Sequence, residues 1–144
     1  MLLRYSKLIS FLLILFFSST LYAEDILIIH QNYGNTHSKH KNRLENAGHT
    51  VTMQNTSSSY SYTAANYDQV YDIRYSYTSY STADKDRFKA VLSNGGTVYL
   101  VGENGNFDSR NDAIVSFLQE VTGDNNIAHS GNSCCGSGVK VVPL

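Results

Sequence analysis

Residues 98–111, VYLVGENGNFDSRN, contain the change from strand to helix that decides the fold. An apolar run at residues 98–101 stops at Gly102, and the polar segment after it leads into apolar residues with helical spacing. This order predicts a strand, a glycine-containing turn and a helix. Ligands bind at such turns in open α/β sheets, because strand carboxyl ends and helix amino ends meet there. The sequence therefore places a candidate site at this turn without naming a reaction.

Strands and helices alternate on both sides of this turn. Helices between strands imply parallel pairing through right-handed crossovers, so we expect an α/β domain with a mostly parallel sheet of 4–5 strands flanked by about three helices. Pro143 would put the last strand at a sheet edge. The predicted strands are residues 25–30, 49–54, 67–75, 97–101 and 138–144. The predicted helices are capped by Asn35 or Thr36, by Ser81 or Thr82, and by Asp108 or Ser109.

Residues 1–23 have the pattern of a secretory signal peptide. Arg4 and Lys7 precede an apolar run at residues 8–17, which is too short to span a bilayer comfortably, and Ala23 ends a candidate cleavage region. An N-terminal membrane anchor is the alternative. We expect a secreted or periplasmic protein with one domain, residues 24–144, and no stable membrane insertion after cleavage. The formal net charge of −1 argues against a nucleic-acid partner.

Cys134 and Cys135 are adjacent in a glycine-rich segment. An oxidising compartment permits disulfides, but neighbouring cysteines cannot close a long loop. A vicinal disulfide, a bond to another chain and two free thiols all remain open.

Two motifs resemble the class I glutamine amidotransferase-like group of flavodoxin-like domains, as found in secreted and surface bacterial proteins. The first is the strand pattern Tyr67-Asp68, Val70, Asp72, Arg74. The second is Gly95-Gly96, Leu100, Gly102-Glu103-Asn104, Phe107, Arg110-Asn111 and Ile114. The resemblance covers nearly all of residues 24–144 and implies a three-layer flavodoxin-like sandwich with its cleft at the carboxyl ends of the strands.

The chain departs from the enzymes of that group at the catalytic turn. Those enzymes carry a cysteine nucleophile there, whereas this chain has Glu103 and Asn104, and its two cysteines come after the next helix. Glutaminase activity is therefore not expected. The resemblance implies the fold and the location of the cleft, and no cofactor follows from it.

Polar residues from several strand ends are expected to converge at this cleft. Glu103 can act as a general acid or base, or it can pair with Arg110 or Arg74. Asp72 and Arg74 share one strand face, so an ion pair between them is the structural alternative. The catalytic candidates are Glu103, Asp72 and Arg110. The ligand-binding candidates are His30, Asn32, Arg74, Asn104 and Asn111.

Three histidines are weak metal candidates. His37 and His40 share a helix face, and His30 ends the preceding strand, so three imidazoles could suit zinc. No carboxylate ligand has a fixed spacing to them, and surface histidines are common. The expectation is therefore that there is no metal site.

Seven tyrosines fall within residues 60–80, interleaved with serine and threonine. Tyrosine combines a large apolar ring with a hydroxyl group, which suits contacts with a saccharide or another surface protein. A loop that packs over the sheet edge is the alternative. The sequence favours a non-catalytic binding or surface-interaction module over a hydrolase or transferase that uses Glu103.

Overall fold

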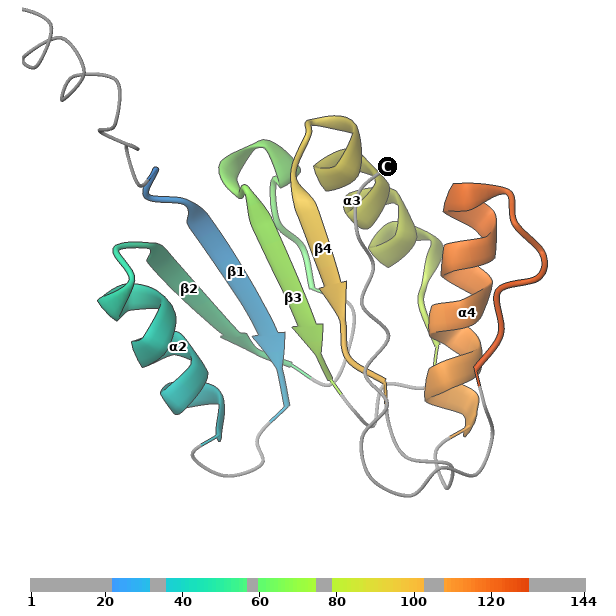
Figure 1. Ribbon diagram of the computed structural model, residues 1–144, viewed down its shortest axis with the longest axis horizontal. Coiled ribbons are helices and arrows are strands. Elements are labelled where there is room, and N and C mark those ends of the chain that lie inside the picture. Colours follow the sequence, from blue (N-terminus) through green and yellow to red (C-terminus); the bar gives the residue numbers. More distant parts are fainter. Residues whose placement is uncertain (1–21, 32–35, 57–59, 75–78, 103–107, 130–144) are drawn as a thin grey trace, which may run out of the picture.

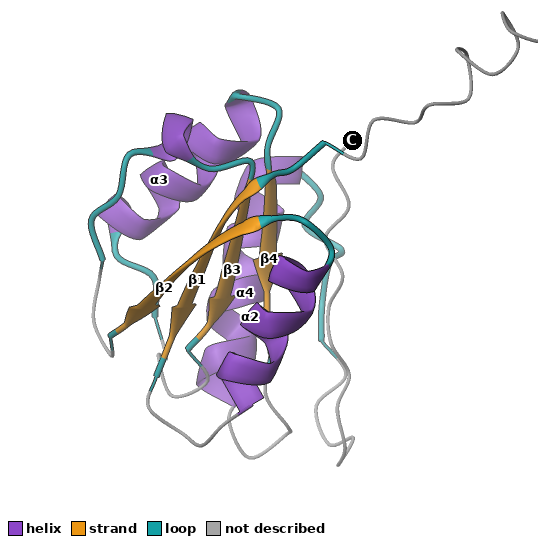
Figure 2. Cartoon of the chain, turned by 90° about the vertical axis from the view of Figure 1, so that its left-hand side faces the viewer, coloured by secondary structure: helices purple, strands orange, loops and turns teal. Residues whose placement is uncertain are grey.

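The computed structural model describes residues 22–31, 36–56, 60–74, 79–102 and 108–129. Within them, four parallel strands form one sheet in the order β2-β1-β3-β4, with helices on both faces (Figures 1 and 2). The strands are β1 (Asp25–His30), β2 (Thr50–Asn55), β3 (Gln69–Ile73) and β4 (Thr97–Leu100). The helices are α2 (Thr36–Asn46), α3 (Thr82–Ser93) and α4 (Asp108–Thr122), with a short 3₁₀ helix η1 (Ala64–Asn66). The α/β class and the three-layer flavodoxin-like arrangement are confirmed.

Strand β1 is the centre of the fold. It pairs in parallel with β2 on one side and β3 on the other, and its apolar residues are buried on both faces because helices cover the sheet from both sides. The crossovers from β1 to β2 and from β3 to β4 run through α2 and α3, as the predicted alternation requires.

The larger core lies between the sheet and the helices α3 and α4. Aromatic side chains dominate it, with the Phe88 and Phe117 rings 5.5 Å apart between centroids and at 65° to each other. Both rings are almost fully buried. The helical spacing predicted after the turn is confirmed, since α4 buries Ile114, Phe117 and Leu118. Helix α3 buries Phe88 and Val91.

The opposite face of the sheet has a smaller core under α2. Ile26, Ile28 and Val51 are buried there, with Leu44 of α2 packed against them. Figure 2, which looks toward the β2 edge, shows α2 on one side of the sheet and α3 on the other. Among the described residues α2 is the helix on this face, and it covers the β1 and β2 half.

Several predicted boundaries shift in the structure. Helix α2 ends at Asn46, and Ala47 after it is exposed. Asp108 is already helical in α4, so it does not act as the cap outside the helix. Ser81 does cap α3. The predicted strand 138–144 lies outside the described residues.

No helix in the described ranges combines the length and the apolar character needed to cross a membrane.

Candidate functional site

Asp72 and Arg74 form a two-pronged ion pair at the carboxyl end of β3. The Arg74 Nε donates to Asp72 Oδ1 at 2.9 Å, and its Nη2 donates to Asp72 Oδ2 at 2.6 Å. The Arg74 backbone N–H also donates to Asp72 Oδ1 at 3.1 Å. The two residues are adjacent on one strand face, as their spacing predicted, and both are 0% exposed.

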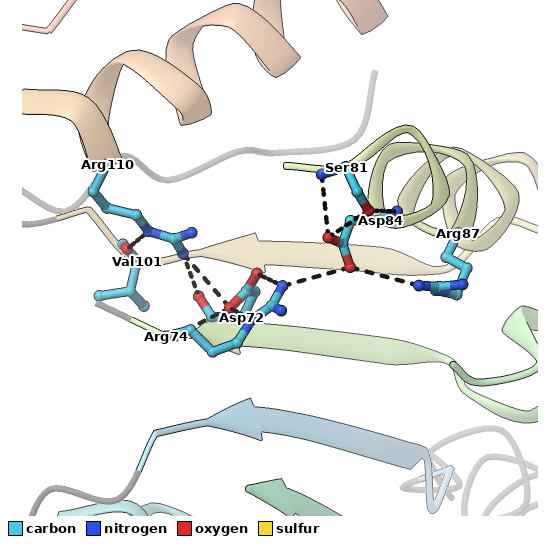
Figure 3. A network of polar contacts seen from close by, with 7 residues as sticks. All are labelled: Asp72, Arg74, Ser81, Asp84, Arg87, Val101 and Arg110. Atoms are coloured by element: carbon cyan, nitrogen blue, oxygen red, sulfur yellow. Dashed lines mark hydrogen bonds and ion pairs between the residues drawn. The ribbon is translucent and has the colours of Figure 1, made fainter. Parts of the chain in front are cut away.

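Asp84 extends this pair into helix α3. Ser81 and Asp84 form a capping box, in which the Ser81 Oγ accepts the Asp84 N–H and the Asp84 carboxylate accepts the Ser81 N–H. The other carboxylate oxygen, Oδ1, lies 3.7 Å from Arg74 Nη2 and 3.6 Å from Arg87 Nη2. Figure 3 shows Asp84 between the two guanidinium groups. The start of α3 is thereby tied to the end of β3.

Arg110 ties helix α4 to the same point. Its Nε donates to the Val101 carbonyl at 3.2 Å, and its Nη2 donates to the Asp72 carbonyl at 3.3 Å and lies 3.6 Å from Asp72 Oδ1. The Tyr80 ring lies 5.0 Å from its guanidinium carbon, a cation–π contact. These contacts offset the unfavourable placement of a positive charge in the first turn of a helix. Arg110 is 0% exposed.

Among the described residues, the fully buried part of this network therefore has two acidic and two basic groups: Asp72, Asp84, Arg74 and Arg110. Arg87, which is partly exposed, also contacts Asp84. Charged side chains are costly to bury unless they are paired and hydrogen-bonded, and each of the four has both kinds of partner. Burial of the neighbouring Tyr80 raises the pKa of its hydroxyl well above its usual range. The arrangement can hold three elements together, but it offers no charged group to a dissolved substrate.

His30 does not join this network, although the sequence predicted that it would. In the register of β1 and β3, Ile29 is opposite Asp72, so His30 points to the other face of the sheet, where α2 lies. The His30 Nδ1 and the His37 Nε2 lie 3.3 Å and 3.0 Å from the Gln31 carbonyl. Burial lowers the pKa of His30 from its usual value, and the nearby His37 adds to that effect.

His40 makes a ring contact of its own with Tyr71. Its ring meets Tyr71 edge-on at a centroid distance of 5.2 Å, and Tyr71 stacks on Tyr99 at 4.2 Å and 15°. The three histidines thus form no common ligand set. Within the ranges that the structure describes, no group of three or more His, Cys, Asp or Glu residues is placed to hold a metal ion.

The tyrosine-rich region is divided between the two faces of the sheet. Tyr60, Tyr62 and Tyr67 pack against the larger core, and Tyr80 is buried within it. Their packing agrees with the alternative interpretation of this region, a loop that packs over the sheet. Tyr71 is on the α2 face, where it meets Tyr99. Tyr75 and Tyr77 lie outside the described residues.

Several predicted site residues cannot be placed. Asn32, Glu103, Asn104, Cys134 and Cys135 lie outside the described residues. Asn111 lies close to Gly102, since a Cβ on Gly102 would come within 2.8 Å of its side-chain oxygen.

Sequence reasoning missed Asp84, Tyr80 and Tyr99 as parts of these clusters. The spacing of Ser81 and Asp84 is that of a capping box and could have identified Asp84. No local pattern indicates that Tyr99 stacks on Tyr71, because that contact depends on the register of β3 and β4.

A small cavity of about 210 Å³ opens at the opposite end of the sheet, by the amino ends of β1, β3 and β4. It is lined by Glu24, Ala64, Ala65, Tyr67, Asp68, Asn94, Gly95, Gly96 and Thr97. It shares no residue with the buried network.

Comparisons of this chain with protein families, with curated proteins and with solved structures gave no match.

Proposed function

We propose that this protein is a secreted, non-catalytic binding module with an amidotransferase-like fold, and that it recognises a saccharide or another surface protein. The observation that carries the proposal is the complete burial of two catalytic candidates. Asp72 and Arg110 are both 0% exposed and in contact with each other. A general acid or base must come within hydrogen-bond reach of its substrate. Neither residue meets that condition.

The proposed binding surface is the half of the α2 face formed by β3 and β4. Tyr71 and Tyr99 are partly exposed there, and Val101, two residues after Tyr99 in the chain, is 41% exposed. Among the described residues, α2 is the helix on this face, and it lies over β1 and β2. Stacked tyrosine rings present apolar edges and hydroxyl groups together, which suits a sugar ring or a polar protein surface.

Secretion is supported by how the domain begins. Tyr22 and Ala23 are exposed and precede β1, so cleavage after Ala23 would remove nothing from the sheet. Mass spectrometry of protein exported from a bacterial host should then show a chain that starts at Glu24. A product that retains residues 1–23 would contradict the signal-peptide interpretation.

The binding proposal is tested by a saccharide array followed by titration calorimetry. A ligand found on the array should bind the Tyr99→Ala variant at least tenfold more weakly. Tyr60→Ala is the matched control, because Tyr60 is also partly buried but packs against the other core. Equal affinity for both variants would place the binding site elsewhere.

The enzyme alternative depends on Glu103. Glu103→Gln should leave ligand binding unchanged, and no hydrolysis or release of ammonia from glutamine should be detected with either protein. A hydrolytic activity that Glu103→Gln abolishes would overturn the non-catalytic proposal.

A further inference from the structure

The rings of His30 and His37 converge on the carbonyl oxygen of Gln31, at the carboxyl end of β1. The His30 Nδ1 lies 3.3 Å from that oxygen, and the His37 Nε2 lies 3.0 Å from it. The two ring centroids are 4.8 Å apart, with an angle of 44° between the ring planes. Two imidazole nitrogens and one carbonyl oxygen are thus gathered at one point, from the end of a strand and from the first turn of α2.

These distances are the ones that a shared metal ion requires. With bonds of about 2.1 Å, neighbouring ligand atoms on an ion lie about 3.0 Å apart at an angle of 90° and about 3.4 Å apart at the tetrahedral angle. Both distances to the Gln31 oxygen fall in that interval. Two imidazoles on one ion have ring centres about 4.5–5.2 Å apart over the same angles, because each centre lies about 3.2 Å from the metal. The observed centroid distance of 4.8 Å agrees with this.

The surroundings of His30 and His37 favour the neutral imidazole. His49 and His129 each lie beside a carboxylate group, which favours the protonated ring. Among the described residues, His30 and His37 lie against each other and an uncharged carbonyl instead. A metal ion needs the neutral ring, because the ligating nitrogen must carry a lone pair.

The group is held by the protein on one side and reached by solvent on the other. His30 is 9% exposed and Gln31 is 6% exposed, whereas His37 is only partly buried. Water can therefore complete the coordination of an ion from the His37 side. Nitrogen and oxygen donors with open positions suit Cu²⁺, which favours tetragonal sites and binds more tightly than the other divalent ions of its row.

We propose that the His30 Nδ1, the His37 Nε2 and the Gln31 carbonyl oxygen form a binding site for a divalent late transition-metal ion, and that Cu²⁺ fits it best. In the metal-bound protein each ring carries its proton on the other nitrogen, the His30 Nε2 and the His37 Nδ1. The set differs from the three histidines considered in the sequence, because His40 packs against Tyr71 and a main-chain oxygen is the third donor. The inference does not depend on the proposed function.

Cu²⁺ titrations of the full chain test the site by calorimetry and by electron paramagnetic resonance. The spectrum of the bound ion should show coupling to two imidazole nitrogens. His37→Gln should bind Cu²⁺ at least tenfold more weakly and show one fewer nitrogen. His40→Gln is the matched control, because His40 is a partly buried histidine of the same helix, and it should keep the affinity and both nitrogens. Circular dichroism of the metal-free variants shows whether each is folded.

His30→Gln tests the buried donor and should also lose one nitrogen coupling. Two results would overturn the proposal. The His30→Gln and His37→Gln variants would keep the affinity and the two-nitrogen spectrum of the unmodified chain, or His40→Gln would lose as much affinity as His37→Gln. The second result would show that Cu²⁺ adsorbs to surface histidines in general.

Discussion

Arg110 and Asp72 meet in the core although 38 positions separate them in the chain. The Arg110 Nη2 lies 3.3 Å from the Asp72 carbonyl oxygen and 3.6 Å from its carboxylate Oδ1. One guanidinium group thus holds both the backbone and the side chain of the same residue. The first turn of α4 is thereby anchored to the end of β3, and Asp72 becomes the common counterion of two arginines.

Asp72→Asn should be strongly destabilising. The substitution keeps the shape of the side chain but leaves Arg74 and Arg110 without their shared counterion in a buried site. Breaking a buried ion pair from one side costs about 3–5 kcal/mol, so we expect a loss of that order in the free energy of unfolding by urea. The control is Asp112→Asn, whose side chain is 72% exposed, and it should change little. Equal losses of unfolding free energy in both variants would contradict the role of Asp72 as the shared counterion of Arg74 and Arg110.

Ser81→Ala should destabilise the protein by about 1 kcal/mol or slightly more. The Ser81 Oγ accepts the Asp84 amide at 3.1 Å and donates to the Asp84 carboxylate at 2.9 Å, so the substitution removes both bonds. Thr82→Ala, at the exposed first position of α3, is the matched control and should be neutral or slightly stabilising. Thermal unfolding followed by circular dichroism compares the two. A smaller loss in Ser81→Ala than in Thr82→Ala would refute the capping box.

Gly96→Ala should cost more stability than Gly102→Ala. A Cβ at Gly96 would lie 2.7 Å from the Asp68 carbonyl oxygen, which belongs to the backbone and cannot move alone. A Cβ at Gly102 would lie 2.8 Å from the Asn111 side-chain oxygen, which can rotate away. We expect about 1–3 kcal/mol for Gly96→Ala, the usual range for overpacking. The free energies of unfolding in urea should show this order, and the reverse order would contradict the two contacts.

Stability should fall as the pH drops below 6.5. Burial holds the pKa of His30 below the value of 6.5 that it has in the unfolded chain, so the unfolded chain binds the proton first as the pH falls. The contribution of neutral His30 to the free energy of unfolding is complete above pH 6.5. It is lost as the pH falls from 6.5 toward the lowered pKa. His40, whose pKa burial also lowers, adds a loss of the same sign.

The NMR titration of the His30 ring should have its midpoint below pH 6.5. The fall in unfolding free energy between pH 7 and pH 5.5 should be smaller in His30→Gln, with the remainder due in part to His40. A midpoint at or above pH 6.5 would show that the His30 prediction is wrong.

The local parts of the fold could be predicted from the sequence. The limits of β1 match the prediction because the run of residues 26–29 is apolar and lies between polar residues. The Asp72 and Arg74 pair follows from side-chain alternation along one strand, which needs no knowledge of the neighbouring strands. The start of α3 follows from Ser81 in the same way.

The contacts between elements could not be predicted. The contact between Arg110 and Asp72 was not among the predicted pairs, because the position of α4 over β3 depends on packing and not on a local pattern. His30 was assigned to the cleft of Asp72, but a register that pairs Ile29 with Asp72 puts it on the other face. A shift of one residue would have reversed that outcome, and strand register is not encoded in either strand alone.

The mutual neutralisation of Asp72, Arg74, Asp84 and Arg110 also limits how this sequence can diverge. A lineage that loses one of these charges passes through a protein with an unbalanced ion in its core, even if a fully apolar replacement of the set would fold well. Selection therefore acts against any single substitution that removes one of these charges. Descendants of this chain are expected to keep all four residues or to have replaced them together, which makes their joint presence a marker of common ancestry.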